Sequence, residues 1–131
     1  MNASNHLEHQ ILNHFFRNTP AAAPAQLFLA LYISDPTDAD IGTEIQGGAY
    51  ARQIITFGEP SQVDGAGQIA NNTQINFPTA SSNWGTVSHW GIRTAATGGN
   101  LLVHSPVPTP KIIENGDEAR FNIGAITISI D

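Results

Sequence analysis

The chain has no cysteine, which excludes disulfides and thiolate metal sites. It also has few charges: 12% of its 131 residues are Asp, Glu, Lys or Arg, against about 25% in an average soluble domain. No apolar run reaches the roughly 20 residues of a membrane span, and the N-terminal segment lacks the apolar stretch of a signal peptide. We therefore expect no membrane partner and synthesis in the cytoplasm, with any outside role needing a route other than secretion.

The sign of the charges excludes a further class of partner. Five Lys and Arg are scattered singly against eleven Asp and Glu, for a formal net charge of −6. This balance argues against nucleic acid as a ligand. Neutral polar side chains supply most of the polarity instead, and such a surface suits contact with other proteins because few charges must be desolvated.

One helix is predicted, over residues 5–17. Asn5 is the expected N-cap, with Glu8 reaching back to it in a capping box. Apolar side chains at helical spacing form one broad face of this helix: Leu7, Ile11, Leu12, Phe15 and Phe16. Prolines then end the helix and hold an extended linker, which gives an N-terminal unit at 1–25 and a single β domain at 26–131.

The β domain is predicted to be an antiparallel β-sandwich of the jelly-roll or immunoglobulin-like kind. Seven or eight short strands separated by Gly, Pro and Asn turns are typical of that class. We expect strands at 26–34, 50–57, 67–70, 73–77, 88–95, 101–104, 120–123 and 126–130. Repeats of the kind that build fibrous shafts are absent.

Two turn and edge features accompany these strands. The alternating prolines Pro106, Pro108 and Pro110 predict a sheet edge or a connection, because proline cannot donate to a strand ladder. Asn115-Gly116-Asp117 predicts a hairpin turn.

Metal sites are weakly indicated. Asp35, Asp38 and Asp40 share a loop with Glu44, but the spacing lacks the glycine and distal glutamate of a calcium loop, so we expect bonds to local backbone amides. His6 and His9 have a spacing that can share zinc, with no third ligand in view. The sequence therefore predicts no metal and no cofactor.

Catalytic residues are also not indicated. Ser88 and His89 are adjacent on an expected strand, where neighbouring side chains point to opposite faces and cannot pair. No nucleophile-elbow motif is present. Glu44 and Arg52 are expected to form at most an exposed ion pair. The chain is therefore predicted not to be an enzyme.

The aromatic residues allow two interpretations. Both tryptophans, Trp84 and Trp90, lie six residues apart, and each is followed by glycine. Together with Tyr50 they belong to the core, or they stack on a sugar ring if they are exposed together.

A series of short segments runs through nearly the whole chain in a fixed order. They include Leu29-Ala30-Leu31-Tyr32, Asp35-Pro36-Thr37, Gly42-Thr43-Glu44, Tyr50-Ala51-Arg52-Gln53, Ile75-Asn76-Phe77-Pro78, Trp84-Gly85-Thr86-Val87, His89-Trp90-Gly91-Ile92 and Gly98-Gly99-Asn100-Leu101-Leu102. In this series the chain resembles a family of small tailed-bacteriophage virion proteins, often described as tail-fibre or minor structural proteins. The resemblance implies a non-enzymatic role on the virion exterior.

Two hypotheses follow for that role. The first is a capsid decoration protein that clamps the major capsid protein or other virion proteins and assembles as a homotrimer by analogy of fold. Its candidate interface consists of the helix face and the proline edge: Leu7, Ile11, Phe15, Phe16, Pro106, Pro108 and Pro110. The alternative is a tail-fibre or tail-tip module that binds a host-surface glycan through Tyr50, Trp84 and Trp90.

Overall fold

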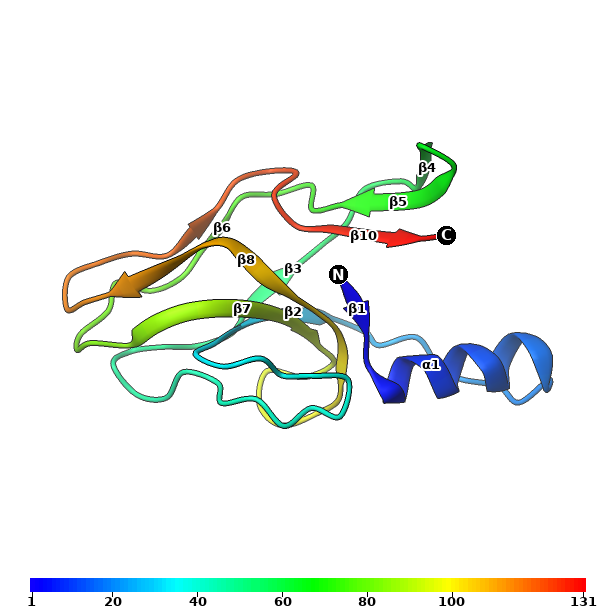
Figure 1. Cartoon of the computed structure of the whole chain (residues 1–131), viewed down its shortest axis with the longest axis horizontal. Helices are drawn as coiled ribbons and strands as arrows, with labels where there is room; N and C mark the ends of the chain where they lie inside the picture. The colour runs from blue at the N-terminus through cyan, green and yellow to red at the C-terminus, as the bar shows by residue number, and fades with distance from the viewer.

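Antiparallel strands in two layers form the framework of the computed structural model, which describes residues 1–131 (Figure 1). One layer is a five-stranded sheet of order β1-β8-β7-β2-β3, and the other holds the sheets β10-β5-β4 and β6-β9. The strands are β1 (Asn2–Ala3), β2 (Leu27–Tyr32), β3 (Gln53–Ile55), β4 (Ser61–Val63), β5 (Ala66–Ala70), β6 (Ile75–Asn76), β7 (Gly85–Arg93), β8 (Leu101–Ile113), β9 (Arg120–Phe121) and β10 (Thr127–Ile130). The prediction of a mainly β, antiparallel, sandwich-like fold with one N-terminal helix is confirmed. Strands β1 and β4 were not predicted.

The core lies between the two layers. Leu31 lies opposite Trp90 in the β2–β7 ladder, and Ile92 lies opposite Val103 in the β7–β8 ladder. These side chains pack in one cluster with Phe77 from the loop after β6. The second face of β2 is covered by loops, so Leu29–Tyr32 is buried on both sides, as a strand apolar on both faces requires.

Strand β8 runs through the prolines rather than stopping before them. Its ladder with β7 loses register there, because His89 pairs with Pro106 and the next β7 partner, Val87, pairs with Lys111. Strand β1 pairs only with Val103 and His104 on the other side. Residues 107–110 therefore have no strand partner, so Pro108 and Pro110 lie in an unpaired stretch. Pro106 pairs with β7 on one side and has no partner on the other, as expected of an edge.

The turn at Asn115–Asp117 is present, but the predicted hairpin is wrong. Strand β8 pairs with β7, whereas β9 pairs with β6 in the other layer. Backbone bonds hold the turn against Ala80, whose N–H donates to the Asp117 carbonyl at 2.8 Å. The chain thus changes layers at a turn that resembles a hairpin in sequence.

The helical segment is one arm in two parts, α1 (Asn5–Ile11) and the π-helical turn η1 (Leu12–Phe16). Its N-cap is Ser4 rather than the predicted Asn5. The Ser4 hydroxyl accepts from the Leu7 N–H at 3.1 Å and donates to the Leu101 carbonyl, so β8 fixes the choice of cap. Neither helical part has the length and apolar character of a membrane span.

Candidate functional site

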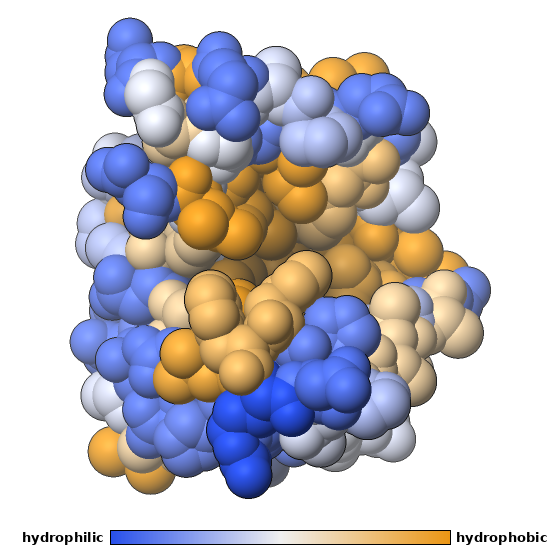
Figure 2. Space-filling view, turned by 90° about the vertical axis from the view of Figure 1, so that its right-hand side faces the viewer, coloured by the Kyte–Doolittle hydropathy of each residue, from blue (hydrophilic) through white to orange (hydrophobic).

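The arm projects from the domain with its distal apolar side chains in solvent (Figure 1). Phe15 is 72% exposed and Phe16 77%, and Leu12 is also largely exposed, whereas Leu7 near the base packs against the core. Figure 2 shows apolar side chains on this end of the molecule, on both sides of a hollow. Adjacent exposed aromatic residues of this kind are typical of contact surfaces.

Hydrogen bonds hold the arm in this position. At its base, the Asn5 N–H donates to the Asp38 carbonyl at 2.9 Å. Beyond its tip, the Thr19 N–H donates to the Asn13 carbonyl at 2.9 Å, and the Ala21 N–H donates to His14 Nδ1 at 3.2 Å. The chain therefore presents its phenylalanines on a tethered element, which lowers the entropy lost when a partner binds.

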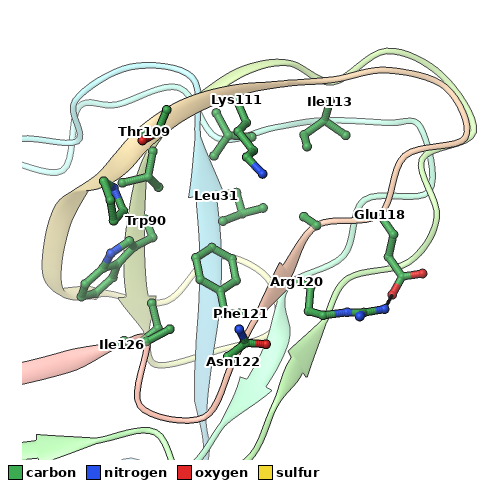
Figure 3. Close-up of a pocket in the computed structure, with 15 residues that line it drawn as sticks. Leu31, Trp90, Thr109, Lys111, Ile113, Glu118, Arg120, Phe121, Asn122 and Ile126 are labelled. Atoms are coloured by element: carbon green, nitrogen blue, oxygen red, sulfur yellow. Dashed lines mark ion pairs between the residues drawn. The ribbon is translucent and has the colours of Figure 1, made fainter.

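A second apolar feature is a groove of about 420 Å³ between β8 and the segment from β9 to Ile126 (Figure 3). Its apolar lining includes Leu31, Trp90, Phe121 and Ile126. Lys111, Glu118 and Arg120 lie around it. On the β8 side, the groove is lined by residues 107–109, which have no strand partner. Pro108 itself lines it, whereas Pro106 and Pro110 are exposed outside it.

The three aspartates of the 35–44 loop accept hydrogen bonds from other groups of the chain. Asp35 accepts from the Thr37 N–H at 2.9 Å, as predicted. Asp38 and Asp40 instead bond distant side chains, Nε2 of His104 at 2.8 Å and the guanidinium of Arg93 at 2.7 and 2.9 Å, so the prediction of local bonds is wrong for these two. No cluster of three or more His, Asp or Glu side chains is placed to hold a metal ion.

A second arginine–carboxylate pair, Arg52 with Glu44, lies beside the pair of Arg93 and Asp40. Both nitrogens of the Arg52 guanidinium fork donate to Glu44, at 2.8 and 2.7 Å, and the Tyr50 hydroxyl donates to the same carboxylate at 2.6 Å. The predicted pair of Glu44 and Arg52 therefore forms, but it is largely buried rather than exposed. Arg52 also donates to the carbonyls of Ala95 and Gly98, which ties the 94–100 loop to the domain.

Ser88 and His89 do form a hydrogen bond, at 2.9 Å between Oγ and Nδ1, contrary to the prediction. The β7–β8 ladder shifts register between Val87 and His89, so strict alternation of side chains fails there. His89 Nε2 lies 3.9 Å from Asp35. Neither Ser88 nor His89 lines the groove.

The aromatic residues considered for glycan stacking do not form an exposed shelf. Trp84 is 5% and Trp90 6% exposed. The Trp84 indole N–H donates to the Gly48 carbonyl at 2.8 Å, and Tyr50 meets Trp84 edge-on with ring centroids 5.5 Å apart. These rings pack as core, and Trp90 shows only part of its ring to the groove.

Residues 2–129 match the family described as Podophage GP4 fiber I protein gp80. The chain belongs to this fiber I family. The match covers the arm and both walls of the groove, and it confirms the resemblance to phage virion structural proteins. No curated protein matches the chain. Membership of the fiber I family gives the chain a structural place in a podophage virion among other virion proteins.

The burial of the two tyrosines of this fiber I family member predicts how the protein responds to alkaline pH. Burial raises the pKa of Tyr50 far above its ordinary value, and the hydrogen bond to Glu44 raises it further. Burial also raises the pKa of Tyr32, although the hydrogen bond from Arg93 opposes this. The chain has no other tyrosine. We expect no tyrosinate absorbance from the native protein near pH 10, where a free phenol is half ionised.

The sign of the linked stability change follows from these shifts. Above about pH 10 the unfolded chain loses phenolic protons that the folded chain keeps, so the free energy of unfolding falls as pH rises. Tyrosinate should therefore appear only together with unfolding in an alkaline titration followed by absorbance and circular dichroism. A phenol titrating near pH 10 in the folded protein would contradict the buried placement of both tyrosines.

Proposed function

We propose that the chain is a non-enzymatic structural module of a podophage fibre and that its arm holds it in the assembly. The observation that carries this proposal is the exposure of Phe15 and Phe16 on a tethered, projecting element. Aromatic side chains bury roughly 150–250 Å² each and are common anchors of protein interfaces. A soluble domain gains nothing from keeping two of them in water, so a partner surface is their physical explanation.

The module contacts neighbouring virion proteins and does not form an extended shaft. A single domain of 131 residues is only a few nanometres across, and the sequence has no shaft repeat. Few charges lie on its surface, and this suits contacts with neighbouring virion proteins. We propose that several copies take part, as a homotrimer on the virion exterior.

Capsid decoration is the second candidate function, with the major capsid protein as the partner. The exposed prolines at 106, 108 and 110 favour it, because a free edge without donors can lie across a neighbouring subunit without adding a strand. The family description favours the fibre. Cryo-electron microscopy of the virion separates the two: density of this chain on fibres supports the first, and density at icosahedral positions supports decoration.

Replacement of Phe15 and Phe16 together by serine tests the role of the arm. We expect the double variant to fold, because exposed substitutions change the free energy of unfolding by less than about 0.5 kcal/mol each. We also expect its incorporation into virions to fall at least about tenfold, since loss of the buried rings removes more than 1.4 kcal/mol of contact energy. Quantitative mass spectrometry of purified virions measures this.

The matched control is Ile54→Ser. Ile54 is 53% exposed on β3, away from the arm. Its variant should enter virions as the unaltered chain does. Normal incorporation of the Phe15/Phe16 variant would show that the arm is not the attachment element.

A further inference from the structure

The exposed apolar tip of the arm and the empty apolar groove lie at opposite ends of the domain. The arm projects beside β1, and the C-terminal end of β8 lies at the far end of the domain (Figure 1). The groove lies between this part of β8 and the segment that begins at β9. The arm is held at its base by Ser4 and Asn5 and points away from the groove. One copy therefore cannot place its own phenylalanines in its own groove.

We propose that the arm tip of one copy inserts into the groove of a second copy. This rests on the proposed function, in that the arm is taken as the contact element, and it names the partner of the arm as another copy of the same chain. Size agrees with this occupant. A cavity of about 150 Å³ holds a benzene molecule, so a groove of about 420 Å³ has room for the rings of both Phe15 and Phe16.

The chemistry of the groove also favours aromatic rings. Phe121 and Trp90 line it and can meet an incoming phenyl ring edge-to-face. The Lys111 ammonium reaches toward the same space in Figure 3, and it forms no ion pair within the chain. An inserted ring would lie against this cation, which is the arrangement of a cation–π contact.

The charges beside the two features are compatible with insertion. Arg17 directly follows the two phenylalanines. On the groove wall Glu118 is exposed, and its contact to Arg120 is 3.6 Å long, so that pair contributes little and Glu118 is available to Arg17 of an incoming arm. No carboxylate lies in the arm beyond Glu8, so no unpaired anion would be buried with the tip.

The single chain exposes more surface than a compact monomer of its size, as expected of a subunit that buries area against a partner. Its accessible surface is 7598 Å², about 900 Å² more than the area expected for a compact monomer of this mass. A specific interface of ordinary size buries about 800 Å² on each partner. Each copy offers one arm and one groove, so either two copies exchange arms about a two-fold axis or successive copies form a ring where the rotation closes.

Two variants that block different halves of the contact test this. Phe15→Ser with Phe16→Ser removes the arm tip but leaves the groove. Ala125→Trp fills the groove from an exposed position on its lining and leaves the arm. Thr109→Trp, from the β8 side, is the second groove variant if the first does not fold, as judged by circular dichroism. Ala96→Trp, exposed in the 94–100 loop, is the control for adding a tryptophan.

Sedimentation velocity over a concentration series gives the readout. The unaltered chain and Ala96→Trp should self-associate, and each blocked variant alone should be monomeric. An equal mixture of the arm variant and the groove variant should form a two-chain species and nothing larger, because one intact arm and one intact groove remain. Its Kd should be at least about tenfold lower than that of either variant with itself.

The contradicting outcomes are distinct. A monomeric unaltered chain, or a mixture of folded variants that stays monomeric, overturns the arm-in-groove contact. If virions lose the arm variant but incorporate Ala125→Trp normally, the arm binds another virion protein, so the proposed function stands and this inference is wrong. If virions incorporate both variants normally, both proposals are wrong.

Discussion

Replacement of Arg93 by alanine is expected to lower the free energy of unfolding by about 1.5–3 kcal/mol, the usual contribution of hydrogen bonds to a charged group. The Arg93 guanidinium, on a residue 8% exposed, donates to both carboxylate oxygens of Asp40 and to the Tyr32 hydroxyl at 3.0 Å. It also donates to the carbonyls of Gly98 and Gly99. The substitution removes the Arg93 donor from Asp40, Tyr32 and Gly99, whereas the Gly98 carbonyl keeps a donor in Arg52. Urea unfolding followed by circular dichroism measures the loss.

The reason for so large an effect is that Arg93 connects two loops to the sheet. The 35–44 loop and the 94–100 loop cover the outer face of β2 and β7 with few apolar contacts of their own. Burial by itself lowers the pKa of Arg93, but the hydrogen bonds to Asp40 and Tyr32 outweigh it, so the pKa is raised and the charge is kept. The guanidinium therefore stays positively charged in the folded chain.

Arg120→Ala is the matched control. Arg120 is exposed and lies 3.6 Å from an exposed carboxylate, that of Glu118. Such pairs contribute about 0–1 kcal/mol, so the variant should unfold within that range of the unaltered chain. Equal losses for the two arginine variants would mean that the Arg93 network contributes no more than a surface pair.

Local patterns predicted the parts of the fold that depend on local physics. The apolar run of Leu27–Tyr32 predicted a central strand because both of its faces need cover, and β2 is buried on both. The prolines predicted a free edge because a missing N–H acts at its own position. The sequence did not predict the groove. One wall of the groove is β9, and the proline pattern in β8 does not specify where β9 lies.

The missed features all join residues far apart in the sequence. Asp40 and Arg93 are 53 positions apart, and Asp38 and His104 are 66 apart. Ser4 rather than Asn5 became the cap because its hydroxyl also reaches the Leu101 carbonyl, 97 positions away. A single sequence gives the types of these residues but not their pairing, so carboxylates that bond β7 and β8 were assigned to local turns.

The helical face was predicted as one surface, and the structure divides it. Leu7 packs against the core, whereas Phe15 and Phe16 extend beyond the edge of the domain. Helical spacing specifies which side chains share a face, but it does not specify how far the domain reaches along the helix. Within the helix, the most exposed part of the predicted interface therefore lies at the tip of the arm.

Replacement of Trp84 by alanine is expected to destabilise the chain by about 3–5 kcal/mol, the usual cost of deleting a buried aromatic ring. The Trp84 indole packs in the core beside Tyr50 and donates to the Gly48 carbonyl at 2.8 Å. Gly48 has φ +59°, and a Cβ there would lie 2.7 Å from the indole nitrogen, so the loop and the ring are fitted to each other. Loss of the ring removes this contact as well as apolar area.

Trp84→Phe separates the two contributions. Phenylalanine keeps most of the buried ring but cannot donate to the Gly48 carbonyl, so we expect a loss of about 1–3 kcal/mol, the cost of an unmade buried hydrogen bond. Thermal and urea unfolding of both variants measure the difference. A loss of less than about 1 kcal/mol for Trp84→Ala would contradict a core role and return this ring to the surface, where the glycan-stacking hypothesis needs it. The structure makes the opposite prediction, because Trp84 already has its partners within the domain: the Gly48 carbonyl accepts from its N–H, and the Tyr50 ring makes a T-shaped contact with it.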